Sequence, residues 1–314
     1  MSESQVRVVQ LNRIEQHPNA DLLSIAMVDG YPVIIRTEDF SIGDLAVYIP
    51  VDSIVPADDP QFAFLAGKTR IKARRLRNVF SMGLLVPAAP DMQIGEDVGD
   101  RLKITKYEEL EPYWMGTEND RDPGFLPVYT DIEGLRKWGD LLCPGEEVVL
   151  TEKIHGANAR FLYREGHLWV GSHKRIKKGT CLWTQIAEKY ELEAKLAQVP
   201  HTAIYGEIYG ANVQALPYGR TDHALLLFDA MDTNTRVYYD FDRFMAIAGF
   251  LGLPTVPVLY RGPWMPSLRD YAEGTSTLAA HVREGFVVRP VKERIDGRIG
   301  RVILKLPGEG YLLR

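Results

Sequence analysis

Lys153 stands where a strand pattern ends and a turn begins, a position that holds a side chain at a surface or in a cleft. The surrounding residues are Thr151-Glu152-Lys153-Ile154-His155-Gly156-Ala157-Asn158. The amine of such a lysine can act as a nucleophile, although most Lys-Gly turns are merely solvated. An attacking amine must be neutral, and free lysine has a pKa of about 10.4. Chemistry at Lys153 therefore requires neighbouring cations, desolvation or a metal that lowers this pKa.

Four later segments place charged or aromatic residues inside or beside strong strand patterns, where a purely structural protein would favour apolar residues. In chain order they are Tyr205-Gly206-Glu207-Ile208-Tyr209-Gly210, Leu227-Phe228-Asp229, Glu284-Gly285-Phe286-Val287-Val288-Arg289-Pro290 and Val302-Ile303-Leu304-Lys305. Together with the turn at Lys153 they give five ordered elements. The presence of all five elements favours one shared functional site over five unrelated structural roles.

The elements that would position these residues form an α+β pattern. Strands are expected at 147–153, 159–163, 167–171, 203–209, 224–230, 285–290 and 301–306. Apolar residues near helical spacing predict one helix over 181–199, stopped by Pro200, and another over 241–251, ending at Gly252 and Pro254.

The first hundred residues show short strand patterns and no long helical period. Strands are expected at 6–11, 22–28, 31–36, 44–50 and 83–87, with Asp29-Gly30 as a hairpin turn. Such spacing is typical of a small β-barrel.

The most charged stretch of this half, residues 68–77, contains six cations. On a strand, Arg70, Lys72 and Arg74 would share one face and form a row of phosphate contacts. A solvated edge strand protected by charge explains the same residues equally well.

A boundary between two domains is expected where periodicity fades and Pro, Gly and acidic residues collect, including Glu111-Pro112. The sequence thus predicts a β-barrel domain at 1–110, a linker at 111–126 and an α+β domain at 127–314.

The five ordered elements resemble the motifs of covalent nucleotidyltransferases, and specifically of RNA ligases. The motif Glu152-Lys153-Ile154-His155-Gly156, with Asn158, is similar to the corresponding motif of RNA ligases that seal nicked duplexes. Residues 205–219, with His17-Pro18-Asn19-Ala20-Asp21 and residues 43–50 of the leading domain, look most like Deinococcus/Naegleria-type RNA ligases. This resemblance covers nearly the whole chain. It implies an N-terminal OB domain followed by a nucleotidyltransferase domain of antiparallel sheets with flanking helices.

The resemblance also implies roles for the main site residues. Lys153 would attack the α-phosphorus of ATP, form lysyl-AMP and release pyrophosphate. Lys305 would contact the phosphate and help lower the pKa of Lys153. Glu207 would accept a hydrogen bond from the AMP ribose, and Glu284 would hold Mg²⁺ or Mn²⁺, with Glu207 as the second acidic residue of the metal site. Phe228 would stack on adenine.

Other positions have less specific implied roles. Glu152, Ile154 and His155 flank the nucleophile and are expected to contact the nucleotide, although His155 could also contact the RNA. Asn158 is expected to bind the 3′-terminal ribose or simply to cap its turn. The second motif needs a cation, and Lys174, Arg175 and His173 are all candidates.

The last motif departs from the family pattern. RNA ligases often have two lysines two residues apart there, whereas this chain has Ile303 and Lys305. A single lysine leaves open the rate and the metal dependence of adenylylation.

The implied activity is ATP-dependent sealing of nicked RNA or RNA-containing duplexes with 3′-hydroxyl and 5′-phosphate ends, in three steps. The alternatives are a DNA ligase, a GTP-using capping enzyme, or a non-catalytic nucleic-acid-binding protein on a ligase scaffold. His155, where DNA ligases have Asp, and the lack of a domain after Lys305 count against the first two. The retention of Lys153, Glu207 and Glu284 counts against the third.

Charge and composition limit the class of protein. The net charge of −5 argues against bulk capture of nucleic acid or of an anionic membrane. Residues 1–126 hold 13 basic and 20 acidic side chains (−7), and residues 127–314 hold 24 and 22 (+2). Any polyanion site must therefore be local.

Localisation is expected to be cytoplasmic. Two cysteines are too few for a disulfide framework, and the sequence shows neither a signal peptide nor a membrane-spanning run. We expect a monomer that has no membrane partner.

Overall fold

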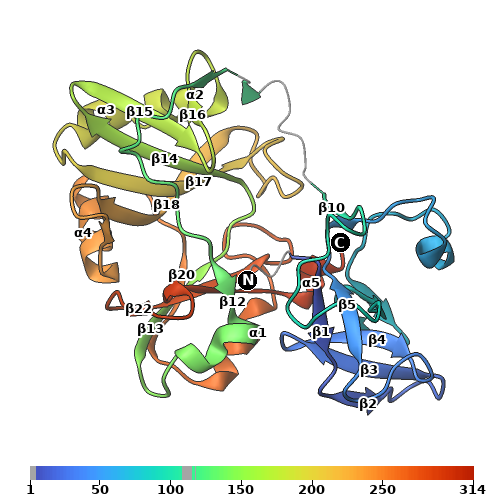
Figure 1. Cartoon of the computed structure of the whole chain (residues 1–314). Coiled ribbons are helices and arrows are strands. Elements are labelled where there is room, and N and C mark those ends of the chain that lie inside the picture. The colour runs from blue at the N-terminus through green and yellow to red at the C-terminus, as the bar shows by residue number, and fades with distance from the viewer. Residues whose placement is uncertain (1–4, 108–114, 117) are drawn as a thin grey trace. The chain divides into compact units, whose positions relative to one another are not determined.

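The computed structural model describes residues 5–107, 115–116 and 118–314. Two compact units are present, one of residues 1–109, 133–138 and 312–314, the other of residues 110–132 and 139–311 (Figure 1). The mixed α+β class, with mostly antiparallel sheets, is as expected. Of the expected linker 111–126, residues 111–114 and 117 lie outside the described residues, including Glu111-Pro112. The domain limits of the sequence analysis remain predictions.

The first unit is built from short antiparallel strands. They are β1 (Arg7–Gln10), β2 (Ile14–Gln16), β3 (Leu23–Val28), β4 (Tyr31–Arg36), β5 (Leu45–Ile49), β6 (Ser53–Ile54), β7 (Arg74–Leu76), β8 (Val79–Ser81), β9 (Leu84–Pro87), β10 (Thr105–Lys106) and β12 (Glu133–Gly134), with the 3₁₀ helix η1 (Pro60–Leu65) and α1 (Leu135–Trp138). They pair as β1-β5-β9, β2-β3-β4, β6-β10 and β7-β8.

Strand β5 carries apolar residues on both faces. Val47 and Ile49 pack into one buried cluster, and Ala46 and Tyr48 pack into another. Both faces of β5 are therefore buried, and the strand joins two parts of the core of this unit. The expected hairpin turn is confirmed, since Asp29 and Gly30 have φ of 51° and 78° between the paired strands β3 and β4.

The basic stretch does not form the single strand that would align its cations. Arg70 makes an isolated bridge with Ile54, Lys72 lies in irregular structure, and only Arg74 belongs to a strand, β7. The Arg70 guanidinium is also engaged, 2.7 Å from Asp52 and 3.6 Å from the centre of the Tyr107 ring. The expectation of a three-residue row on one strand face is therefore wrong. A local ion pair and a cation–π contact replace it.

The second unit contains the longer strands and helices. The strands are β11 (Asn119–Asp120), β13 (Glu147–Glu152), β14 (Ala157–Arg164), β15 (His167–Ser172), β16 (Ile176–Lys177), β17 (Thr202–Gly210), β18 (His223–Asp232), β19 (Val237–Tyr238), β20 (Val258–Pro263), β21 (Gly285–Pro290), β22 (Ile295–Asp296), β23 (Gly300–Arg301) and β24 (Leu304–Pro307). The helices are η3 (Gly139–Leu141), α2 (Leu182–Lys189), α3 (Leu192–Leu196), α4 (Phe241–Phe250), η4 (Pro266–Ala272) and α5 (Glu309–Leu312).

One antiparallel sheet has the order β11-β16-β15-β14-β17-β18-β19, and helices α2, α3 and α4 pack on one of its faces through a large apolar cluster (Figure 1). The single helix expected over 181–199 is broken at Glu191, whose φ of 54° is left-handed. Apolar residues on both sides of the break stay buried, which is why the helical period runs through it.

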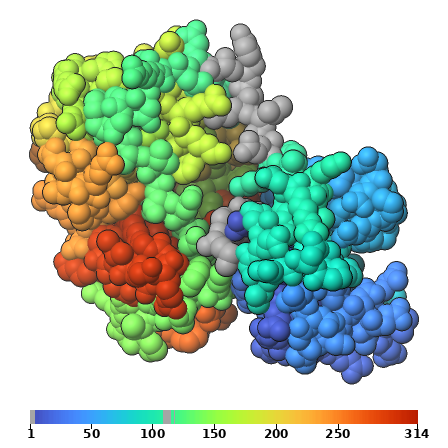
Figure 2. All heavy atoms as spheres, in the orientation of Figure 1, coloured from blue at the N-terminus to red at the C-terminus, as the bar shows by residue number. Residues whose placement is uncertain are grey.

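The second sheet of this unit runs β24-β21-β13-β20. Neighbouring strands are antiparallel, with Thr151 opposite Val287 and Val287 opposite Lys305. Figure 2 shows that α4 and the segment around β22 and β23 reach the surface of this unit. None of the helices in the described part of the chain has both the length and the apolar character needed to cross a membrane.

Candidate nucleotide site

The second sheet directs one face of β13 into a cavity of the second unit. Side chains alternate along a strand, so Val149, Thr151 and Lys153 share a face, and all three line the cavity. Val287 and Arg289 on β21 line it as well. Because Lys305 is directly opposite Val287, it emerges on this same face.

The seven-stranded sheet contributes the opposing wall. The face of β14, β17 and β18 that is turned away from the helices carries Asn158, Glu207 and Phe228, and all three line the cavity. Asn158 and Glu207 are directly paired across β14 and β17. Two sheets thus bring residues from separate sequence motifs to one place.

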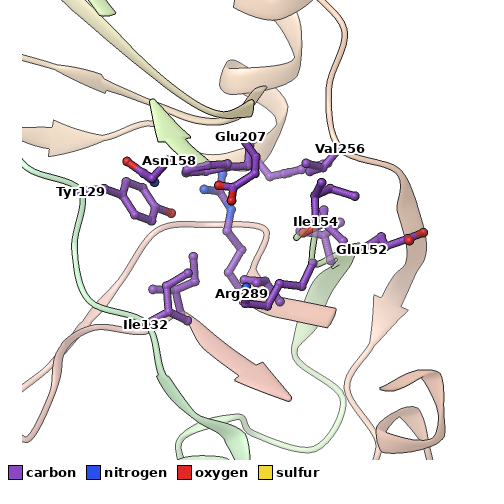
Figure 3. A pocket seen from close by; sticks show the side chains of 15 residues that line it. Tyr129, Ile132, Glu152, Ile154, Asn158, Glu207, Val256 and Arg289 are labelled. Atoms are coloured by element: carbon purple, nitrogen blue, oxygen red, sulfur yellow. The ribbon is translucent and has the colours of Figure 1, made fainter. Parts of the chain in front are cut away.

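The cavity has a volume of about 260 Å³ and a mixed lining. In Figure 3, Tyr129 and Asn158 lie on one side, and Ile154 and Val256 lie on the other. Polar groups of Lys153, Glu207 and Asn158 share it with the apolar side chains of Phe228 and other residues. Such a lining suits a ligand with a flat apolar part and a charged part.

Lys153 is held by an ion pair, with Nζ 2.7 Å from Oε1 of Glu284. Burial acts to lower the pKa of Lys153, but the carboxylates of Glu284 and Glu207 outweigh it and raise the pKa above its ordinary value. The structure therefore holds a charged amine, and the expected lowering of its pKa is not met here. Deprotonation of Lys153 requires a change in its pairing with Glu284.

The two carboxylates have different surroundings. Burial raises the pKa of Glu207 to about 8, although the nearby Lys153 acts to lower it. Among the described residues, Oε2 of Glu284 is buried without a hydrogen-bond partner, and Nδ1 of His155 is 3.8 Å from it. A buried acceptor of this kind fits a hard divalent cation. Within the described residues, no cluster of three His, Cys, Asp or Glu side chains forms a metal site, so the phosphates of a nucleotide would have to supply ligands too.

Glu152 lines the cavity, but its carboxylate is engaged by a neighbouring loop. Its carboxylate accepts hydrogen bonds from Ser276 Oγ at 2.5 Å, from the Thr277 amide at 2.9 Å and from the Thr277 hydroxyl at 2.6 Å. Because the carboxylate oxygens are already satisfied, Glu152 holds the 276–277 loop against the turn. Ile154 also lines the cavity.

His155 lies beside the cavity rather than in its lining. Its amide donates to the Tyr218 hydroxyl at 2.7 Å, and Nδ1 is 3.0 Å from the Tyr311 hydroxyl. Lys174 and Arg175 are exposed and outside the lining, whereas Lys177 of the same segment is buried, 4.4 Å from the centre of the Trp183 ring. The structure does not bring Lys174 or Arg175 into the cavity.

Tyr129 and a buried charge network were missed by the sequence reasoning. The Tyr129 hydroxyl donates to Asp229 at 2.8 Å, and its ring meets Phe228 edge to face at 4.9 Å. Arg289 and Arg301 each reach Asp229 at 2.7 Å. Tyr129 stands in an irregular segment with no periodic signal. Asp229 and Arg289, however, were already visible as charges inside strand patterns.

Comparison with known proteins agrees with this architecture. An RNA ligase family model matches residues 146–306, and an OB-fold domain model matches residues 5–88. No curated protein gives a significant match.

Among solved structures, the chain is similar to a mutant of the Naegleria gruberi RNA ligase with ATP and Mn, and to the same enzyme with PPi. In both cases the TM-score is 0.87 and the identity 22%, over 98% of each chain. A further similar structure is a mutant of that ligase with AMP and Mn, at the same TM-score and identity. The fold is therefore shared along nearly the entire chain. Since the family model spans half of the sequence and includes all five motifs, this chain belongs to the RNA ligase family.

Proposed function

We propose that this protein is an ATP-dependent RNA ligase that seals nicks with 3′-hydroxyl and 5′-phosphate ends through a lysyl-AMP intermediate. The observation that carries the proposal is the position of Lys153. Lys153 lines a cavity together with Glu207 and the aromatic side chain of Phe228, and its amine pairs with the carboxylate of Glu284. A lysine nucleophile and an apolar base site next to hard oxygen ligands are the parts that adenylyl transfer needs.

The nucleotide would lie with its base among the apolar side chains and its phosphates toward Lys153 and Lys305. Phe228 from one sheet and Val287 from the other line the cavity and offer flat or apolar contact surfaces. Glu207 would accept a hydrogen bond from the ribose. Lys305 would neutralise charge that develops on the α-phosphate during attack.

Glu284 and Glu207 would hold Mg²⁺ or Mn²⁺, which would screen the charge of the phosphates. The partnerless Oε2 of Glu284 supports this assignment. Glu284 also holds the protonated amine of Lys153, so a carboxylate that turns toward a cation would release that amine from its ion pair.

The RNA strand would contact Asn158 and the basic part of the first unit. Oδ1 of Asn158 is buried on the cavity wall and has no hydrogen-bond partner within the described part of the chain, which supports a contact with the 3′-terminal ribose. Lys72 and Arg74 are exposed and supply phosphate contacts. Arg70 contributes less, because it already pairs with Asp52.

The proposed protein acts as a monomer in the cytoplasm on nicked RNA or RNA-containing duplexes. Both cysteines, Cys143 and Cys181, are free, which supports a reducing compartment.

The specificity test compares nicked duplexes that differ only in the sugar at the 3′-hydroxyl end. We expect sealing with a terminal ribose, strong loss of sealing with deoxyribose, and no sealing by Lys153→Ala. Lys292→Ala, at an exposed lysine, serves as the matched control and should seal normally. Equal sealing of nicks with either sugar would instead identify a DNA ligase. Covalent transfer of GMP from GTP, with no transfer of AMP from ATP, would identify a capping enzyme.

A further inference from the structure

Helix α5 lies against the turn that follows Lys153. The Tyr311 hydroxyl is 3.0 Å from Nδ1 of His155, and the two rings meet edge to face with centres 5.5 Å apart. Tyr311 also packs against the apolar cluster that contains Ile154. A residue six positions beyond Lys305 thus touches the second residue after the nucleophile.

The segment that leads to Tyr311 is anchored at its three preceding residues, 308–310. The Gly308 amide donates to the Glu284 carbonyl at 2.9 Å, which extends the pairing of β24 with β21. The amides of Glu309 and Gly310 donate to the Glu273 carboxylate at 2.5 and 3.3 Å. A Cβ at position 308 would lie 2.5 Å from the Ala272 carbonyl oxygen, so the close approach requires glycine. Tyr311 is therefore held in place independently of His155.

His155 is in turn fixed from three directions. Its amide donates to the Tyr218 hydroxyl, and Nδ1 faces both the Tyr311 hydroxyl and, at 3.8 Å, Oε2 of Glu284. A phenol hydroxyl has one proton to donate, and Nδ1 of a neutral imidazole can accept it only when the ring proton is on Nε2. Because Oε2 of Glu284 at 3.8 Å is beyond hydrogen-bond distance, the Tyr311 contact at 3.0 Å bears more directly on the choice of tautomer.

We propose that Tyr311 is a positioning residue of the ligase site, which fixes the ring of His155 and keeps its proton on Nε2. In this form Nε2 is a donor suited to a phosphate oxygen of the RNA end. The effect of Tyr311 on sealing rests on the proposed function of the site. The effect of Tyr311 on the tautomer of His155 does not depend on that function.

The direct test is ¹⁵N nuclear magnetic resonance of the full chain labelled at histidine, with the His155 signals assigned from His155→Gln. In the unmodified protein at a pH where the ring is neutral, we expect the pattern of a proton on Nε2. Tyr311→Phe should shift it toward a mixture of tautomers, while Tyr260→Phe, which removes a hydroxyl that donates to the Pro263 carbonyl, should leave it unchanged. An unchanged tautomer in Tyr311→Phe would overturn the proposal even in a protein without ligase activity.

A double-mutant cycle separates positioning from a structural role. Tyr311→Phe should lower kcat for nick sealing by roughly three- to tenfold, as expected for one lost hydrogen bond. The KM for ATP should stay unchanged, because neither Tyr311 nor His155 lines the cavity. In a His155→Gln background the same change should have no further effect. Additive losses, or a rise in the KM for ATP, would contradict action through His155. Absence of sealing by the unmodified protein would count against the proposed function alone.

Discussion

Lys153 sits between two carboxylates rather than among cations. The ion pair with Glu284 and the proximity of Glu207 raise the pKa of Lys153 although burial opposes them. The side chain of Lys153 is thus held as a charged ammonium group that is oriented by Glu284. In the proposed reaction Lys153 becomes a neutral nucleophile when Glu284 binds a divalent cation instead of the Lys153 amine. Glu284 thus links the nucleophile to the metal site.

Phe228 is expected to account for much of the affinity for the base. Phe228→Ala should raise the KM for ATP by about ten- to a hundredfold, because stacking of a base on an aromatic side chain is worth about 1–3 kcal/mol. Phe250→Ala is the matched control, since Phe250 is exposed on α4. Steady-state kinetics with varied ATP measures both variants. An unchanged KM in Phe228→Ala would remove the stacking role.

At the scale of elements, the alternation of side chains on β13 and β21 explains how the site is built. Polar groups point into the cavity at Thr151, Lys153 and Arg289, while Leu150 and Val288 on the other face are fully buried. Below the cavity, Asp229 joins β18 to β21 and to Arg301 through buried ion pairs. This network fixes the spacing of the two sheets.

Asp229→Asn should therefore lower the free energy of unfolding by about 3–5 kcal/mol, because it removes the buried carboxylate that Arg289 and Arg301 share. Both arginines then keep Glu293 as their carboxylate partner. Asp242→Asn removes a carboxylate from an exposed ion pair with Arg261 and should cost less than about 1 kcal/mol. Chemical denaturation of both variants gives the comparison. Similar losses for the two substitutions would show that the buried network contributes little.

The same network predicts a dependence of stability on pH. Burial acts to raise the pKa of Asp229, but Arg289 and Arg301 outweigh it and hold the pKa below its usual range. A depressed folded-state pKa gives stability that is present above the unfolded-state pKa and is lost as the pH falls through the folded-state pKa. The unmodified protein should accordingly lose stability below about pH 4. Asp229→Asn should lose less over that range, and a parallel decline in both proteins would contradict the assignment.

The β7–β8 region gives a prediction for RNA binding. Lys72→Ala with Arg74→Ala should weaken binding of a nicked duplex and reduce the slope of log K against log salt by about 2, one unit per lost phosphate contact. Arg70→Ala should have a smaller effect, since Arg70 is already paired with Asp52 and stacked on Tyr107. Filter binding at several salt concentrations tests this. Equal affinity and slope in the double variant would exclude the patch as an RNA contact.

At the scale of the whole molecule, the sequence predicted features that depend on local signals. Asp29-Gly30 has the residues that a tight hairpin needs, and the motif around Lys153 is contiguous in the chain. The break at Glu191 escaped prediction because burial on both sides preserves the helical period. Arg70 and Tyr129 escaped it because Asp52 and Asp229, their partners, are distant in sequence. Contacts between residues that are distant in sequence produce no periodic pattern in the sequence.

The central claim is a covalent bond between Lys153 and AMP, and incubation with α-labelled ATP and Mg²⁺ or Mn²⁺ tests it most directly. The account predicts label bound to the unmodified protein, discharged by pyrophosphate, and none bound to Lys153→Ala, while Lys292→Ala is labelled normally. Undiminished labelling of a folded Lys153→Ala protein, or no labelling of the unmodified protein with any nucleotide, would contradict it.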